Sequence, residues 1–161
     1  NDMADTSLFS HLNKISAFME SYFILKIFLA FVLGGVIGWE RENIGKIAGI
    51  RTLGFICVAS CAISILSLML EDADPTRMIS LIALGIGFLG GAIIFLSENE
   101  DRSLQGVTTA ACLWVVSGIG VLVALKLYLL ATASMLLTLF ALKLPSFPFW
   151  MRVSKKKSRR T

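Results

Sequence analysis

Three long stretches of the chain contain no acidic residue, basic residue or histidine. They are Thr52–Leu70, Met78–Ser97 and Ser103–Leu125. Each is close to or above the roughly 18 to 20 residues that an α-helix needs to cross a ~30 Å hydrocarbon core. A soluble protein would need a larger fold to surround such helices than 161 residues can build. The pattern therefore predicts an integral membrane protein.

The rest of the apolar pattern adds two further spans. The first is Tyr22–Trp39, with Lys26 in its first turns, where a long side chain is expected to extend to the membrane surface. Later, apolar chain runs from position 106 to 142 and is broken only by Lys126. One helix over that length would measure about 60 Å, twice the bilayer core. It is therefore expected to form two spans, with a turn near Gly118, Gly120 and Lys126.

We accordingly expect an all-α integral membrane bundle of about five transmembrane helices with a short N-terminal amphipathic helix. The expected transmembrane domain covers 22–144, with spans at about 22–39, 52–70, 76–96, 104–123 and 127–144. Residues 1–21 carry apolar residues at spacings of three and four, typical of one face of a helix. They are expected to lie along the membrane surface; a plain extension of the first span is the alternative. Residues 145–161 are expected to form a basic cytoplasmic tail.

The distribution of basic residues predicts the orientation of the bundle. The chain has a net charge of +4, and its last ten residues contain Arg152, Lys155, Lys156, Lys157, Arg159 and Arg160. Basic residues close to spans mark the cytoplasmic side of a membrane. Because five spans place the termini on opposite sides, we expect an outside N-terminus and a cytoplasmic C-terminus. Attraction to anionic lipid explains the tail, so no nucleic acid is expected as a partner.

Small residues recur every four positions in two of the spans. Such ridges let helix backbones approach closely in lipid, where packing drives association. The two ridges are expected to be helix-packing surfaces that can face each other. They consist of Ala30, Gly34 and Gly38 in the first span, and of Ala83, Gly87 and Gly91 in the third.

Charged and hydroxyl residues gather where the first, second and fourth spans are expected to reach the cytoplasm. The candidate polar cluster consists of Glu40, Arg41, Glu42, Lys46, Arg51, Thr52, Thr108 and Thr109. In one interpretation these residues only end helices in water, because exposed ion pairs contribute just ~0–1 kcal/mol. In the other, Glu40 and Arg51 form a partly buried pair. The hydroxyls and helix-terminal amides at the start of the fourth span would then hold an anion or dock a partner.

Three blocks of sequence resemble the MgtC/SapB family of bacterial membrane proteins. Residues 38–52 fit the pattern G-x-E-R-E-x-x-G-K-x-A-G-x-R-T. Residues 85–90 resemble its G-I-G-F-L-G, and residues 106–114 its G-L-T-T-A-A-x-L-W, in the family's order. The chain departs from the family at Gln105, where a basic residue is usual. Many members also carry a soluble domain after the last span, where this sequence has a short basic tail.

The resemblance implies a protein of the bacterial inner membrane without an established catalytic activity. Family members are linked to growth at low magnesium and to survival inside macrophages, and one is reported to act on the F-type ATP synthase. The family was once described as part of a magnesium transporter. We therefore expect a regulatory protein of the lipid bilayer that contacts another membrane protein complex. The alternative is a transporter or channel for Mg²⁺ or another ion, formed by a homo-oligomer.

No residue pattern in the sequence indicates catalysis or a bound cofactor. Paired carboxylates, a Ser-His-Asp set, a phosphate-binding loop and a metal-ligand cluster are all missing, and His11 is the only histidine. Cys57 and Cys61 lie at helical spacing without a third ligand in their span, so buried packing is expected rather than a soft metal. We expect no enzyme activity, no cofactor and no metal.

Overall fold

A computed structural model of the chain describes residues 2–70, 74–98 and 103–144, and these form an all-helical fold. Side chains are described for 20–70, 74–97 and 106–144. The helices are α1 (Asp2–Asn43), α2 (Ile50–Met69), α3 (Pro75–Glu98), α4 (Ser103–Ala124) and α5 (Tyr128–Lys143). The prediction of an all-α fold is confirmed. The expected basic tail at 145–161 lies outside the described residues.

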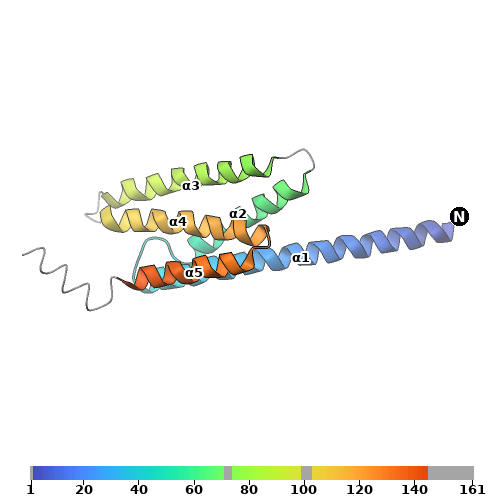
Figure 1. Cartoon of the computed structure of the whole chain (residues 1–161), viewed down its shortest axis with the longest axis horizontal. Coiled ribbons are helices and arrows are strands. Elements are labelled where there is room, and N and C mark those ends of the chain that lie inside the picture. Colours follow the sequence, from blue (N-terminus) through green and yellow to red (C-terminus); the bar gives the residue numbers. More distant parts are fainter. Residues whose placement is uncertain (1, 71–73, 99–102, 145–161) are drawn as a thin grey trace, which may run out of the picture.

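Successive helices run antiparallel, and α4 occupies the centre of the bundle. In Figure 1, α4 lies between α3 and α5 and in front of α2, and it contacts all four other helices. Its apolar stretch is 56% buried, whereas that of α3 is only 17% buried. The core is built mainly from α1, α2 and α4, with Ile37, Leu53 and Leu113 among its largest side chains. The helix α3 is therefore the most exposed of the long apolar helices.

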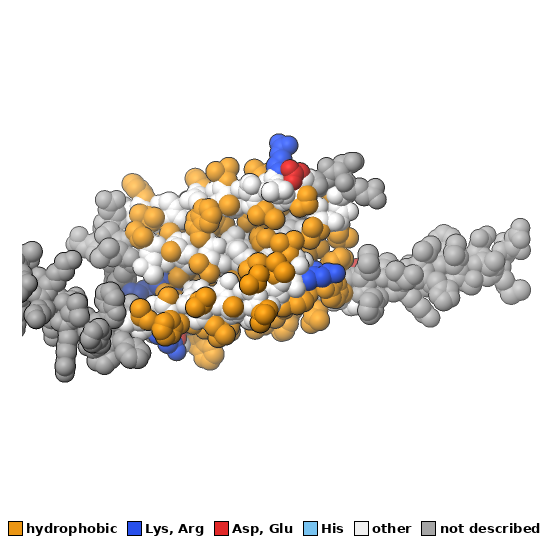
Figure 2. Space-filling view, in the orientation of Figure 1, with side chains coloured by type: hydrophobic (Ala, Val, Ile, Leu, Met, Phe, Trp, Pro, Cys, Tyr) orange, Lys and Arg blue, Asp and Glu red, His pale blue; other side chains and the backbone are white. Residues whose placement is uncertain are grey.

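Four of the helices contain a stretch that is long and apolar enough to cross a membrane. These stretches are Glu20–Asn43, Ile50–Met69, Pro75–Ser97 and Gly106–Ala124. The helix Tyr128–Lys143 is apolar but shorter. Figure 2 shows hydrophobic side chains covering the body of the bundle, with charged side chains towards its two ends. This distribution is the one expected of a protein surrounded by lipid.

The N-terminal segment continues directly into the first span. Residues from Asp2 onward belong to α1, which runs without a break to Asn43, and Figure 1 shows this helix extending far beyond the bundle. The arrangement corresponds to the alternative interpretation of 1–21, an extension of the span. Its placement along the membrane surface stays a prediction.

Two of the described helix ends, those of α1 and α4, use the same backbone motif. After α1, the amide of Gly45 donates to Glu42 O (2.9 Å) and that of Lys46 to Arg41 O (3.1 Å), with Gly45 at φ +68°. This pair of hydrogen bonds around a left-handed residue is the Schellman motif, which satisfies carbonyls at the end of a helix.

The same two hydrogen bonds recur after α4, around a lysine. The amide of Lys126 donates to Val123 O (3.1 Å) and that of Leu127 to Leu122 O (2.9 Å), with Lys126 at φ 65°. The turn between the last two spans is therefore centred on Lys126. Gly118 and Gly120, where a turn was also expected, lie inside α4.

The helix α3 begins with a side-chain cap. Asp74 Oδ1 accepts hydrogen bonds from the amides of Thr76 (2.9 Å) and Arg77 (3.4 Å), and Pro75 is the first helical residue. Hydrogen bonds from the Thr76 side chain and from the Arg77 and Thr76 amides hold the pKa of Asp74 below its usual range. This is the standard use of aspartate and proline at a helix start.

The backbones of α1 and α2 approach so closely that side chains are excluded between them. A Cβ on Gly34 would lie 2.7 Å from Cys57 Cβ and 2.8 Å from Leu53 O. A Cβ on Gly38 would lie 2.6 Å from Ile50 Cα. Ala30, the third member of this ridge, is fully buried. The ridge of the first span thus packs against α2.

The ridge of the third span does not meet that of the first. In the described bundle α3 contacts α4 and α2 but not α1. Gly90 provides the close contact with α4, where a Cβ would lie 3.3 Å from Ala110 Cβ. A Cβ on Gly87 would lie 3.9 Å from Trp114, whereas one on Gly91 would meet nothing within 4 Å. Ala83 lines a cavity between α3 and α4.

The close approach of α1 and α2 leads to a prediction for two neighbouring glycines. Gly38→Ala should lower the free energy of unfolding by about 1–3 kcal/mol, because the new methyl group overlaps the α2 backbone. Gly35→Ala is the matched control, since its Cβ would lie 3.7 Å from the nearest atom, an ordinary contact. Thermal unfolding in detergent, followed by circular dichroism, measures both. Equal stability of the two variants would contradict this packing.

Candidate functional site

Arg41 is buried at the end of α1 and reaches across to α4. Its side chain is 3% exposed, and its Nη2 donates a hydrogen bond to Thr109 Oγ1. Its Nε has no hydrogen-bond partner among the described residues, and no carboxylate there forms an ion pair with it. Burying a charge without a counter-ion costs free energy. Arg41 therefore makes a specific buried contact between α1 and α4, and is not an exposed side chain at a helix end.

Glu40, the preceding residue, belongs to a different contact. Its carboxylate lies 3.9 Å from Lys143 Nζ at the end of α5, and the side chains are 24% and 65% exposed respectively. Arg51 is exposed at the start of α2 and Glu40 pairs with Lys143, so the interpretation in which Glu40 and Arg51 form a partly buried pair is wrong. The distance and exposure of the observed pair indicate a contribution of no more than ~1 kcal/mol.

Glu42 caps the start of α2. Its Oε2 accepts a hydrogen bond from the amide of Ile50 (3.0 Å), so a negative charge lies at the positive end of a helix, where it is favourable. A Cβ on Gly49 would lie 2.5 Å from the same oxygen. Gly49 therefore leaves the space in which the carboxylate can reach across the loop.

The loop between α1 and α2 surrounds a small polar pocket of about 300 Å³. The lining residues are Glu42, Lys46, Ile47, Gly49, Arg51 and Thr52. Two cationic side chains and one carboxylate that already caps a helix give the pocket a basic balance. Its chemistry fits a carboxylate or phosphate group of a partner better than a cation.

The structure divides the predicted polar cluster into separate parts. Arg41 and Thr109 meet in the interior, Glu40 meets Lys143, and the remaining residues of the first loop surround the pocket. Thr108 is exposed and lines an apolar cavity between α4 and α5. The spacing in the sequence predicted that these residues lie at one end of the bundle. It did not predict which side of its helix each residue occupies.

Lys26 was expected to extend to the membrane surface, and this prediction is wrong. Its side chain is 4% exposed, and its Nζ donates to the carbonyl of Ala124 at the end of α4 (2.7 Å). Buried hydroxyls were also missed, including Ser60 Oγ, which lies 3.1 Å from Ser117 Oγ between α2 and α4. Nothing in the local sequence shows which face of a uniformly apolar helix turns inward.

The described residues contain no group of three or more His, Cys, Asp or Glu side chains that would hold a metal ion. Cys57, Cys61 and Cys112 are free thiols buried in the core. The two cysteines of α2 take part in helix packing, with Cys57 directly against Gly34. The described part of the chain thus offers polar contacts between helices, with its cysteines engaged in packing.

Comparison with known proteins gives one consistent result. The sequence profile described as the MgtC family matches residues 27–147, which include most of the described bundle. An uncharacterized protein of Haemophilus influenzae is 33% identical over 84% of this chain and 60% of its own length. Protein MgtC of Brucella abortus is 42% identical over 58% of this chain and 38% of its own length.

Protein MgtC of Salmonella typhimurium is 38% identical to this chain over 74% of this chain and 50% of its own length. The chain therefore spans from about two fifths to three fifths of the length of these relatives. No solved structure matches the sequence. The region matched by the family profile, 27–147, includes the residues of the polar pocket.

The buried contact between α1 and α4 leads to a prediction for Thr109. Thr109→Val removes the oxygen that accepts from Arg41 at nearly constant volume, and should lower the free energy of unfolding by about 1–3 kcal/mol, the usual penalty for a buried polar group that loses its partner. Thr52→Val, an exposed threonine at the same end of the bundle, is the control and should change little. Chemical unfolding in mixed micelles measures both variants. Equal losses would show that Arg41 does not depend on this hydroxyl.

Proposed function

The chain belongs to the MgtC family, and from this premise we propose that it is a non-enzymatic protein of the bacterial inner membrane. It regulates another membrane protein complex by direct contact. A link to magnesium limitation or to virulence is part of the proposal and rests on the resemblance to the family. The geometry adds a surface on which such a contact can form.

The observation that carries the proposal is the two uncovered glycines of α3. Gly85 and Gly91 are exposed, and a Cβ at either position would meet nothing within 4 Å. Glycine weakens a helix by about 1 kcal/mol relative to alanine, and the close packing that normally offsets this is missing at both positions. In lipid, small residues are typical of surfaces where another helix packs. A transmembrane helix of a partner complex is the occupant that these glycines suit.

The charges of the spans support a binding role over transport. Described acidic side chains occur only at or just outside the ends of the membrane-length apolar stretches, at Glu20, Glu40, Glu42 and Asp74. A pathway for a divalent cation normally needs oxygen ligands with carboxylates among them, and ionisable groups inside spans mark such pathways. The buried cations Arg41 and Lys26 are engaged by a hydroxyl and a carbonyl of α4.

The proposed orientation places the N-terminus outside and the C-terminus in the cytoplasm. Lys46, Arg51 and Lys143 lie at the end of the bundle that holds the polar pocket, and Arg77 and Lys126 lie at the opposite end. In the sequence, the basic residues of 152–160 follow α5, whose last residue, Lys143, lies at the first of these ends. Basic residues favour the cytoplasmic side, which supports a cytoplasmic polar pocket.

A transporter or channel formed by several copies is the second candidate. The observation that favours it is a row of buried hydroxyls on α2, in which Ser64 Oγ and Ser67 Oγ have no hydrogen-bond partner among the described residues. Hydroxyls can line a pathway for a partly hydrated ion. Purified protein in phosphatidylcholine vesicles should then conduct Mg²⁺ or K⁺ above protein-free vesicles, and Ser64→Ala should reduce the flux. Flux equal to that of empty vesicles would eliminate this candidate.

The proposed partner contact leads to a prediction for Gly91. Gly91→Leu fills the open face of α3 and should reduce recovery of the partner complex at least about tenfold, which corresponds to ~1.4 kcal/mol. The stability of the bundle should not fall, because a Cβ at this position would meet nothing within 4 Å. Affinity purification from membranes in mild detergent, quantified by mass spectrometry, measures the recovery.

The matched control is Ala133→Leu, which enlarges an exposed residue on α5. Partner recovery should be unchanged in this variant. Equal recovery with Gly91→Leu and wild type would remove α3 as the contact surface. Recovery of the protein alone, from several mild detergents, would count against the regulatory proposal itself.

A further inference from the structure

The end of the bundle opposite the polar pocket contains a buried lysine that the proposed function does not use. Lys26 Nζ donates to Ala124 O (2.7 Å) and lies 5.0 Å from the ring centroid of Tyr22 and 5.8 Å from that of Phe23. An ammonium group has three donors. One of them is engaged, and the rings supply only the weaker attraction of an aromatic face.

No anionic side chain in the described residues forms an ion pair with Lys26. The one described ion pair, between Glu40 and Lys143, lies at the other end of the bundle. A charge that is 96% buried requires a counter-charge or a full set of hydrogen bonds to avoid a large desolvation penalty. The carbonyl at the negative end of α4 supplies part of this compensation.

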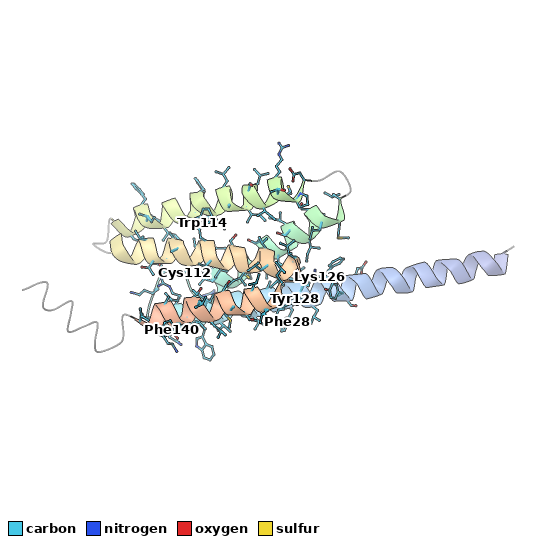
Figure 3. The ribbon with its side chains drawn as sticks, viewed as in Figure 1. Phe28, Cys112, Trp114, Lys126, Tyr128 and Phe140 are labelled. Atoms are coloured by element: carbon cyan, nitrogen blue, oxygen red, sulfur yellow. The ribbon has the colours of Figure 1, made fainter. Side chains whose placement is uncertain are left out.

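A second ammonium group approaches the same tyrosine. Lys126 Nζ lies 5.7 Å from the centroid of the Tyr22 ring. Both lysine nitrogens therefore lie near the same ring, and the distance between them cannot exceed the sum of their two distances to its centroid. Tyr22 is held by a hydrogen bond between its hydroxyl and that of Tyr128 (3.1 Å). Figure 3 shows Lys126 and Tyr128 at the α4–α5 turn, beside the point where α1 leaves the bundle.

Both lysines line one cavity with predominantly apolar walls. It has a volume of about 310 Å³ and lies between α1 near Lys26, the C-terminal end of α2 and the C-terminal end of α4. The lining residues are Phe23, Lys26, Ile65, Leu68, Met69, Ala124, Leu125 and Lys126. Leu68 and Met69 are exposed, so the cavity opens towards the lipid. A ligand that fits it has an anionic head and an apolar body.

We propose that this cavity, between Lys26 and Lys126, binds the phosphate group of an anionic phospholipid. The phosphate bridges the two ammonium groups, and an acyl chain follows the apolar wall formed by Ile65, Leu68 and Met69. The apolar walls favour a lipid over free phosphate, which would leave them wetted. The positive balance favours an anionic lipid over a zwitterionic one, whose own cation would meet the lysines.

The first test locates the lipid on the wild-type chain. Phosphatidylglycerol with a photoactivatable acyl chain, in phosphatidylcholine nanodiscs, should label peptides that contain Leu68 and Met69 more strongly than the lipid-facing residues of α3, such as Leu84 and Phe88, both strongly exposed. Excess unlabelled phosphatidylglycerol should abolish this preference, whereas inorganic phosphate should not. Labelling spread evenly over the lipid-facing helices would overturn the proposal, and competition by inorganic phosphate would identify a bare anion site instead.

The second test removes one charge without disturbing the turn. Lys126→Asn eliminates the ammonium group while asparagine still tolerates the left-handed conformation, and it should weaken phosphatidylglycerol binding about tenfold in native mass spectrometry. Lys126→Arg should retain binding. Arg77→Asn removes a charge at the same end of the bundle and is the matched control; Arg77 is exposed and does not line the cavity. Equal binding by Lys126→Asn and Arg77→Asn would contradict the site.

Discussion

Two buried cations on one face of α1 hold that helix against α4. Lys26 binds the carbonyl of Ala124, and Arg41 binds the hydroxyl of Thr109. The two contacts are 15 positions apart on each helix, so they share an axial spacing of about 22 Å in an antiparallel pair. Neither cation can move along α4 without leaving a buried charge unpaired, which is costly in a low dielectric. These contacts therefore fix the register of α1 on the central helix.

With α1 in this register on α4, several residues of the sequence block 38–52 have defined structural roles. Gly38 lets the α2 backbone pass, Arg41 fixes α1 on α4, and Glu42 closes the start of α2. Gly45 supplies the left-handed residue that reverses the chain, and Gly49 makes room for the Glu42 carboxylate. Each of these roles needs one residue type at one position. The block is thus the joint between three helices, and only its exposed residues around the polar pocket remain for contact with a partner.

The sequence predicted the elements better than their faces. Uncharged runs identified the long helices because spanning a bilayer demands length and apolarity, properties that are local. The ridge of Gly34 and Gly38 was also readable, since four-residue spacing is itself a helical face. The inward position of Lys26, the separation of Glu40 from Arg41 and the open side of Gly91 were not. Consecutive helical residues point about 100° apart, and in a uniformly apolar helix only long-range packing decides which direction is inside.

The distribution of filled and open surfaces indicates where this bundle can act. Between α1, α2 and α4 the interior is occupied by close-packed apolar side chains and glycine contacts, so a ligand there would have to displace them. Open features at the periphery include the uncovered glycines of α3, the polar pocket at one end and the lysine-lined cavity at the other. Two of these three carry uncompensated positive charge. Lipid phosphates and acidic partner segments are the anions available at a membrane surface. In the functions proposed above, the packed core holds the basic ends and the uncovered glycines of α3 in fixed positions for such contacts.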